Sequence, residues 1–331
     1  GDDRLIVDDL DTAVDGGVGT DTIVILADTT FGLLAADGET EQLENVEEAE
    51  LASGVTLTVD STDTAANAGE IADVTGVDDA ATETLVVIGS TLGENVTADF
   101  TAVTFTDVLL DYRGGAGEDE VTGTAAADIL SGGFGEDTLT VGEDGGADTL
   151  TGGDGEDTFD VSANDSATDI VVITDFEVAV SDGGEPAAGE VVDTLTVGEE
   201  VLNGQDRADF YEVATREDGQ VSASFAVDED GVVTFFEETT ALAGTQEVFA
   251  ETTADALTFV DALVLNLATD AEEGTFVFGL DEDANGTAES SIVLSYLADG
   301  SVTNVVKLVG VTGGLGDGTG IGDITIGAPV V

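Results

Sequence analysis

Residues 114–122, 132–140 and 152–160 read GGAGEDEVT, GGFGEDTLT and GGDGEDTFD. Each is a copy of one nine-residue pattern, Gly-Gly-x-Gly-x-Asp-x-apolar-x, and repetition at a short fixed period indicates a solenoid whose turns pack on their neighbours. Glycines permit the positive φ angles of a tight loop and leave its backbone carbonyl oxygens uncovered. These carbonyl oxygens and the aspartate carboxylate are hard oxygen ligands of the kind that calcium prefers. The stretch therefore predicts a calcium-binding coil.

The last three residues of each copy favour a short strand, in which the apolar eighth residue, Val121, Leu139 or Phe159, faces inward and forms a thin core. The sixth-place aspartates and the loop glycines are the expected calcium ligands. They are Gly114, Gly115, Gly117 and Asp119, then Gly132, Gly133, Gly135 and Asp137, then Gly152, Gly153, Gly155 and Asp157.

Two degraded copies, GTAAADILS at 123–131 and EDGGADTLT at 143–151, lie between the intact ones. They keep the acidic place as Asp128 and Asp148 and the apolar place as Leu130 and Leu150. In a flattened two-sheet roll, successive turns face opposite edges, so the three intact loops share one edge. We expect a row of well-formed calcium sites there, and at most a weaker site from Asp128 with Asp148 on the opposite edge.

These copies resemble the nonapeptides of the RTX (repeats-in-toxin) family, and the resemblance implies a parallel β-roll that binds calcium in its turns. Residues 16–24, GGVGTDTIV, are a fourth intact copy, and its sixth-place Asp21 is a further expected calcium ligand. IVVITDF at 170–176 resembles the strand that closes an RTX block, and VVKLVGVT at 305–312 resembles the end of a chain exported by a type I secretion system. Toxins, proteases, lipases, adhesins and surface-layer proteins share this repeat, so the resemblance names no single function.

The alternative interpretation of the repeats is a glycine-rich acidic linker. A linker has no reason to keep an apolar residue at a fixed offset, which disfavours this interpretation.

Composition limits the function further. The chain has 73 acidic and five basic residues, a formal net charge of -68, and no histidine, cysteine, methionine or tryptophan. Nucleic acid is excluded as a direct partner, because phosphate binding needs basic groups, and an anionic membrane is disfavoured except through a calcium bridge. Without histidine, the ordinary Ser-His triads and zinc sites are excluded, and no spacing singles out a pair of catalytic carboxylates. We expect no enzyme. Repeat aspartates bind calcium in this interpretation, while scattered glutamates keep the surface hydrated.

Threonine- and valine-rich segments with alternating polarity, and only two prolines, predict an all-β protein with a short parallel β-roll and at most one or two short helices. We expect a β-rich domain at 1–108 with the isolated repeat, the roll at 109–176, and a C-terminal β-rich domain at 177–331. Within the last, 181–189 predicts a loop and 254–267 one helix, from the spacing of its apolar residues.

Four shorter patterns give local predictions. Gly1, Asp3 and Leu5 fit the fourth, sixth and eighth places of a nonapeptide, either as a partial repeat or by chance. DEDANGTAE, at 281–289, carries Asp281, Asp283 and Asn285 in the order of a calcium loop, but an Asn-Gly hairpin turn fits equally well. Asp230-Gly231 predicts a hairpin turn, and 313–321 predicts a loop without metal.

The leading hypothesis is a secreted calcium-dependent structural protein that polymerises with itself on or outside a bacterial cell, as a surface layer or a filament. We expect type I secretion, no membrane insertion, since no apolar run reaches the length of a membrane span, and a cell-surface polysaccharide as a further candidate partner. The alternatives are the calcium-stabilised end of a large RTX adhesin and the non-catalytic secretion part of an RTX enzyme.

Overall fold

A computed structural model describes two compact units of the chain, residues 1–163 and 164–331, and each is treated separately below. The described residues are 1–7, 14–31, 43–60, 71–77, 81–90, 93–143, 146–164, 166, 169–178, 192–197, 211–212, 223–227, 233–237, 247–248, 274–280, 288–297, 302–312, 315–316 and 324–326. The all-β prediction is confirmed, because nearly all regular structure in this part of the chain is β-strand.

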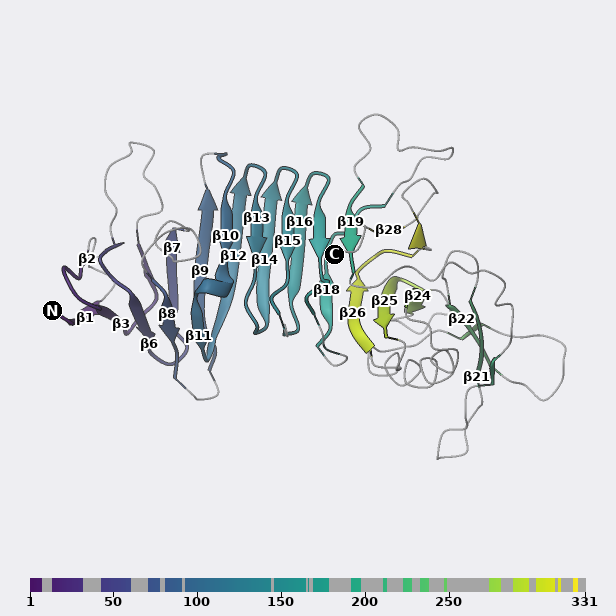
Figure 1. Cartoon of the computed structure of the whole chain (residues 1–331), viewed down its shortest axis with the longest axis horizontal. Helices are drawn as coiled ribbons and strands as arrows, with labels where there is room; N and C mark the ends of the chain where they lie inside the picture. Colours follow the sequence, from purple (N-terminus) through teal and green to yellow (C-terminus); the bar gives the residue numbers. More distant parts are fainter. Residues whose placement is uncertain are drawn as a thin grey trace. The chain divides into compact units, whose positions relative to one another are not determined.

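The first unit is a stack of parallel strands (Figure 1). A single 3₁₀ turn, η3 (Phe100–Ala102), is its one helical element among the described residues. The strands are β1 (Arg4–Val7), β2 (Val14–Asp15), β3 (Thr22–Ile25), β4 (Thr29–Thr30), β5 (Leu43–Glu44), β6 (Glu48–Leu51), β7 (Thr56–Asp60), β8 (Asp73–Thr75), β9 (Glu83–Ser90), β10 (Thr97–Asp99), β11 (Thr104–Thr106), β12 (Val108–Ala116), β13 (Glu120–Thr122), β14 (Asp128–Phe134), β15 (Thr138–Thr140), β16 (Thr149–Asp154) and β17 (Thr158–Asp160).

These strands form three parallel sheets and one small pair within the unit. Their orders are β1-β3-β6-β8-β11, β4-β7-β9-β12-β14-β16, β10-β13-β15-β17 and β2-β5. Parallel pairing requires a crossover between neighbours, and here each crossover passes through the opposite sheet, as in a coil.

The register of the roll follows the nonapeptide. Thr138 pairs with Glu120 on one side and with Thr158 on the other, while Ile129 pairs with Thr149 in the opposite sheet. The strands that end the three intact copies therefore share one sheet, and those that begin within the two degraded copies share another. The predicted alternation of edges is confirmed.

The core of the roll is the column of eighth-place residues. Val121, Leu139 and Phe159 are completely buried, with the threonines on either side of Leu139 only half-buried. Leu130 and Leu150 form the facing column and are also completely buried. Full burial of such a side chain contributes roughly 1.5–3 kcal/mol, so these columns hold the two sheets together.

Parallel pairing also extends to the N-terminal side of the predicted roll. Strand β12 pairs with β14 and equally with β9, so there is no break in pairing at residue 109, where the sequence analysis placed the start of the roll. The edge-to-face contact of Phe100 with Tyr112, at a ring-centroid distance of 5.7 Å, packs the same region. The nonapeptide pattern ends there, but alternating apolar residues continue to supply inward-facing side chains.

In the second unit, parallel and antiparallel pairing coexist. Its strands are β18 (Val171–Ile173), β19 (Thr194–Thr196), β20 (Tyr211–Glu212), β21 (Ala223–Val227), β22 (Val233–Glu237), β23 (Glu247–Val248), β24 (Gly274–Leu280), β25 (Ser290–Tyr296), β26 (Val302–Leu308), β27 (Leu315–Gly316) and β28 (Ile324–Ile326). Strand β18 pairs in parallel with β26, and β26, β25 and β24 follow as antiparallel neighbours.

Four local predictions fall in this unit. The strand expected at 170–176 is present as β18. Antiparallel pairing of β21 with β22 agrees with a hairpin around Asp230-Gly231, although the turn residues themselves lie outside the described part. The helix predicted at 254–267 and the loop predicted at 181–189 also lie outside it.

Candidate calcium-binding turns

The intact turns share one backbone shape, set by their glycines. The glycine at the second place has a φ of 109° at Gly115 and 113° at Gly133. The glycine at the fourth place has a φ of 145° at Gly117 and 135° at Gly135. Residues with a side chain rarely adopt these backbone angles, so the second and fourth places require glycine. The turn can therefore fold tightly and leave its carbonyl oxygens uncovered.

The first glycine is required for a different reason, which is space. A Cβ on Gly132 would lie 2.2 Å from Oδ2 of Asp137, and one on Gly114 would lie 2.3 Å from Oδ2 of Asp119. The same point at Gly114 is 2.2 Å from the carbonyl oxygen of Gly132 in the next turn. A carboxylate oxygen and a backbone carbonyl from adjacent turns thus converge over the first glycine.

The sixth-place aspartates form a column of hydrogen bonds along this edge. The backbone N–H of Val96 donates to Oδ1 of Asp119 at 2.7 Å, and the N–H of Asp137 donates to Oδ1 of Asp157 at 2.9 Å. Between them, the N–H of Asp119 donates to Oδ1 of Asp137 at 2.7 Å. All three aspartates are buried, at 2%, 1% and 2% exposure. Each carboxylate uses one oxygen to fasten its turn to the preceding one.

The second oxygen of these carboxylates is the strongest indication of a ligand. Oδ2 of Asp119 and Oδ2 of Asp137 are buried and have no hydrogen-bond partner. A buried carboxylate oxygen without a partner is costly, and buried charges are normally paired or coordinate a metal. Carboxylate and carbonyl oxygens are the donor set that calcium prefers, so the residues present fit this ion.

Burial raises the pKa values of the aspartates in this column. The pKa of Asp137 is raised to about 6, chiefly by burial and also by the negative charges of Asp157, Asp119 and Glu118, against the opposing hydrogen bond from the N–H of Asp119. Burial also raises the pKa of Asp119, against the opposing hydrogen bond from Val96. A bound cation would favour the ionised form of both groups.

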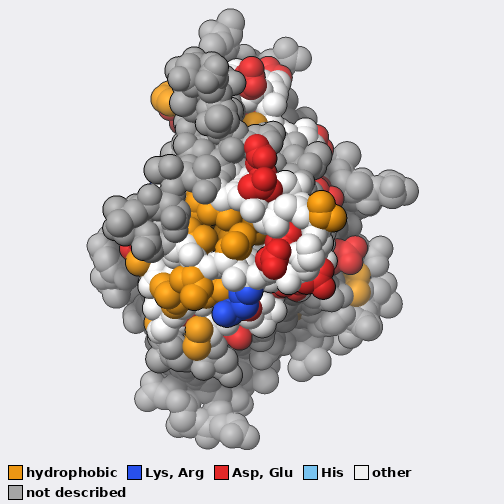
Figure 2. All heavy atoms as spheres, turned by 90° about the vertical axis from the view of Figure 1, so that its left-hand side faces the viewer, with side chains coloured by type: hydrophobic (Ala, Val, Ile, Leu, Met, Phe, Trp, Pro, Cys, Tyr) orange, Lys and Arg blue, Asp and Glu red, His pale blue; other side chains and the backbone are white. Residues whose placement is uncertain are grey.

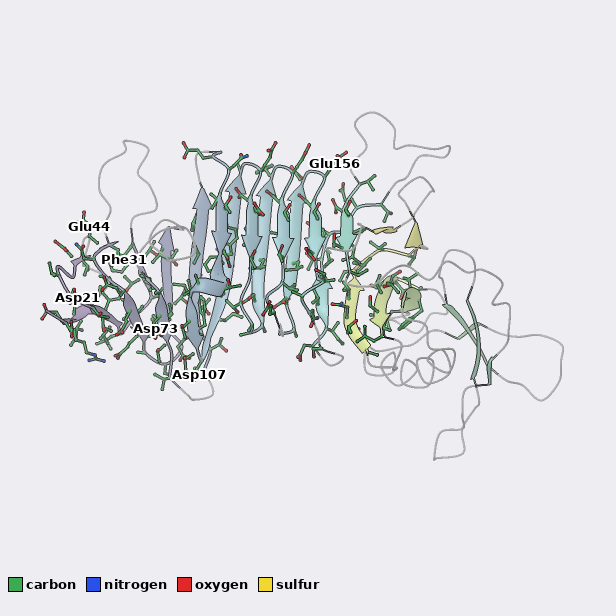
Figure 3. All side chains as sticks on the ribbon, in the orientation of Figure 1. Asp21, Phe31, Glu44, Asp73, Asp107 and Glu156 are labelled. Carbon is green, nitrogen blue, oxygen red and sulfur yellow. The ribbon has the colours of Figure 1, made fainter. Side chains whose placement is uncertain are left out.

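The glutamates at the fifth place face solvent, unlike the buried aspartates at the sixth place. Glu118, Glu136 and Glu156 are exposed while the aspartates that follow them are buried. Figure 3 shows Glu156 at the turn edge of the roll. Each turn therefore separates one acid that faces inward from one that faces solvent.

The opposite edge is built differently. The backbone N–H of Thr124 donates to Oδ2 of Asp128 at 2.6 Å. The Thr124 hydroxyl lies 2.9 Å from Oδ1 and 3.0 Å from Oδ2, so its single proton can serve Oδ1 while the N–H serves Oδ2. Its own N–H donates to Oδ1 of Asp148 at 2.8 Å. Burial raises the pKa of Asp128 to about 6, which the bonds from Thr124 partly oppose. Because Thr124 engages both oxygens of Asp128, this carboxylate is committed within the chain, and the weaker site expected here stays a prediction.

The isolated repeat at 16–24 reproduces the intact turn. Gly17 and Gly19 have φ angles of 94° and 151°, and Asp21 is completely buried with a free, unpartnered Oδ2. The N–H of Asp3 donates to Oδ1 of Asp21 at 2.7 Å, and Leu5 pairs with Ile23. The segment GDDRL therefore stacks on this repeat as a partial repeat, which favours that interpretation over chance.

Other candidate residues stand as follows. Asp281, Asp283 and Asn285 lie outside the described residues, while the strands on either side of them, β24 and β25, pair as a hairpin. Asp193, which no nonapeptide match marks, is also buried and accepts a hydrogen bond from the N–H of Glu177 at 2.7 Å. The four residues that start at Asp193 read DTLT, as at 137–140 and 148–151, and this match could have revealed it.

Within the described ranges, no three acidic side chains converge closely enough to hold a metal by carboxylates alone. A cation in these turns therefore needs backbone carbonyls as well, which is usual for calcium loops.

No helix in this part of the chain is both long and apolar enough to cross a membrane. Comparison with protein-family models, curated proteins and solved structures found no significant match.

Proposed function

We propose that this chain is a secreted, calcium-dependent structural protein that assembles with copies of itself on or outside a bacterial cell, as a surface layer or a filament. The observation that carries the proposal is the row of buried carboxylates in which Oδ2 of Asp119 and of Asp137 has no partner. Calcium at these oxygens would complete the turns and offset part of the formal charge of -68.

The mechanism would be a calcium switch. At low calcium, ionised carboxylates stacked in one column repel each other without compensation, so the folded roll is disfavoured and the chain remains extended enough for export. Outside the cell, sites with dissociation constants of roughly 10⁻⁴ to 10⁻³ M fill, and binding to the folded state alone stabilises it. The aspartate column would make folding cooperative, because each carboxylate is fastened to the preceding turn.

Assembly is supported by the N-terminal end of the first unit. Among the described residues, β1 is the last strand of its sheet, and strands at a sheet edge are those that can pair with another chain. Figure 2 shows hydrophobic side chains gathered on this end of the molecule, and Ile6 and Leu26 are 67% and 56% exposed. Exposed apolar side chains beside an edge strand are suited to contact with a further copy.

Addition of calcium to the purified, chelator-treated chain tests both parts of the proposal. Circular dichroism should show β-structure that increases with calcium, and that decreases and melts at a lower temperature in chelator, with an equal concentration of magnesium as control. Light scattering and electron microscopy of the same samples should show ordered sheets or fibres. A calcium-folded chain that stays monomeric at every concentration would contradict the assembly, and β-structure that is indifferent to calcium would contradict the switch.

A further inference from the structure

A second column of acidic residues lies at the N-terminal end of the first unit. The N–H of Asp3 donates to Oδ1 of Asp21, and the N–H of Asp21 donates to Oε2 of Glu47, both at 2.7 Å. The carbonyl oxygen of Asp21 accepts in return from the N–H of Glu47 at 3.1 Å. This arrangement matches the column of Asp119 and Asp137, except that a glutamate from a turn without repeat glycines replaces one aspartate.

The turn that carries Glu47 reaches the same geometry by other means. Asn45 has a φ of 52°, a left-handed conformation that asparagine tolerates better than most residues. A Cβ on Gly16 would lie 2.0 Å from the carbonyl oxygen of Asn45 and 3.0 Å from Cγ of Asp21. The corresponding point at Gly114 lies beside a carbonyl of the next turn and the carboxylate of its own turn in the same way.

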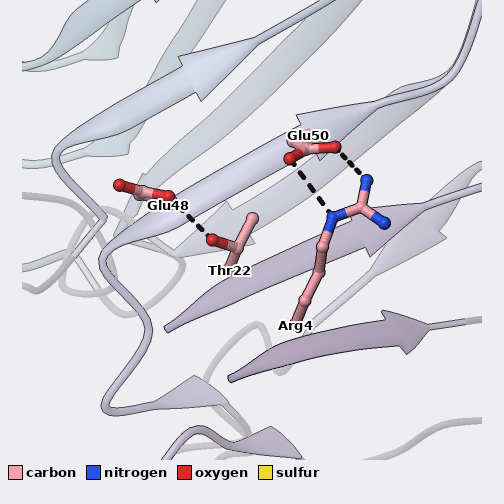
Figure 4. A network of polar contacts seen from close by, with 4 residues as sticks. All are labelled: Arg4, Thr22, Glu48 and Glu50. Carbon is pink, nitrogen blue, oxygen red and sulfur yellow. Dashed lines mark hydrogen bonds and ion pairs between the residues drawn. The ribbon is translucent and has the colours of Figure 1, made fainter. Parts of the chain in front are cut away.

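Among the described residues, neither Asp21 nor Glu47 makes an ion pair, and the N-terminal ammonium of Gly1 donates to the carbonyl oxygen of Val18 in the same turn. Asp21 is completely buried, and its Oδ2 has no hydrogen-bond partner. Oδ1 of Asp15 accepts hydrogen bonds from the N–H of Gly17 and from Nδ2 of Asn45, which joins the two turns at their outer ends. The nearby guanidinium of Arg4 is engaged by Glu50 on the sheet surface (Figure 4).

We propose that Asp21 and Glu47, with the carbonyl oxygen of Asn45, form a calcium-binding site of their own, outside the block of repeats at 114–160. The proposal rests on the calcium-dependent folding argued above. It assigns Glu47, which no repeat pattern marks, as a ligand. The site bridges two turns of different length, so calcium there would hold the N-terminal layers of the coil together. Figure 3 places Asp21 among these layers.

The column ends after Glu47, which limits the site to one position. The register that pairs Glu48 with Asp73 puts Ala72 opposite Glu47, and the N–H of Ala72 donates to the carbonyl of Glu47 at 2.9 Å. Because alanine supplies no carboxylate, the next turn cannot continue the series. A single ion between the Asp21 turn and the Glu47 turn is the expected occupancy.

Calcium binding to the full chain tests this assignment, with isothermal titration calorimetry as the measure of stoichiometry. Glu47→Gln and Asp21→Asn should each remove one bound calcium, or weaken its binding at least tenfold, and leave the other sites unchanged. Glu48→Gln is the matched control. It removes the same charge from the adjacent residue, whose Oε2 accepts from the hydroxyl of Thr22 on the face of the sheet (Figure 4).

The outcomes separate this proposal from the broader one. If Asp137→Asn loses calcium while Glu47→Gln and Asp21→Asn keep the native stoichiometry, the N-terminal site is wrong and the roll sites stand. If the native chain binds no calcium, both proposals fail. Circular dichroism checks that each variant folds, and Glu47→Gln decides if the buried Asp21→Asn does not fold, because Glu47 is only half-buried.

Discussion

The backbone N–H of Asp119 donates a 2.7 Å hydrogen bond to Oδ1 of Asp137, one turn further along the roll. Asp137 thus has two separate roles. Its Oδ1 joins its turn to the preceding turn, while its buried Oδ2 has no hydrogen-bond partner within the chain. Folding and ion binding are coupled through a single side chain.

Asp137→Asn should weaken calcium binding by at least tenfold, equivalent to about 1.4 kcal/mol, because the amide keeps an acceptor oxygen but loses the charge. Asp137 has intact turns on both sides, so its loss should affect two neighbouring sites. Titration calorimetry and calcium-dependent circular dichroism measure the effect. Asp128→Asn on the opposite edge is the control, and an equal loss of calcium affinity there would disprove the difference between the two edges.

Thr124→Val should destabilise the roll by about 1–3 kcal/mol with or without calcium, because it removes the hydroxyl that donates to Asp128. Thermal unfolding in calcium and in chelator measures the change. Thr122→Val, a half-buried threonine on β13, gives the background cost of the same substitution. A destabilisation seen only in calcium would show that the Thr124 turn itself holds an ion.

Gly132→Ala should weaken both folding and calcium binding, since its Cβ would meet Oδ2 of Asp137 at 2.2 Å. Gly132 does not have a positive φ, so the substitution tests space and not backbone strain. Overpacking of this kind costs about 1–3 kcal/mol. Gly1→Ala, where a Cβ would meet open space, should have no effect on thermal unfolding. Full calcium affinity in Gly132→Ala would mean that Asp137 does not bind through Oδ2.

The calcium-free chain should become more stable as the pH falls from about 7 to about 5. Burial raises the pKa of Asp137 and of Asp128 to about 6, from an ordinary value of 3.8. Between these values the folded state binds more protons than the unfolded state, so acid stabilises folding. Calcium requires the ionised carboxylates, so its affinity should fall over the same range.

Thermal melts in chelator and in calcium, at each pH, measure both effects. The gap between the two melting temperatures should shrink towards pH 5. A calcium-free melting temperature that falls on acidification over this range would show that the buried aspartates are already ionised and compensated in the folded chain.

Much of the fold could be predicted from local pattern. Val121 and Leu139 are buried as their eighth place predicts, and Asp119 and Asp137 are buried as their sixth place predicts. The extent of the coil was harder to predict from the sequence. Strand β9 pairs with β12, and its segment has alternating apolar residues but no nonapeptide. Such alternation predicts a strand but not its neighbour.

The sequence by itself determined the period of the roll, the sharing of one edge by the three intact turns, and the acidic character of that edge, because each depends on residues at fixed spacing. Only the tertiary structure decided which carboxylate oxygens are engaged. Thr124 satisfies Asp128 from within the chain, whereas Asp137 keeps one oxygen without a partner, and Glu47 joins Asp21 across a turn of different length. These relationships depend on how turns stack in space, and hydrogen bonds between layers are not encoded in the spacing of residues within one turn.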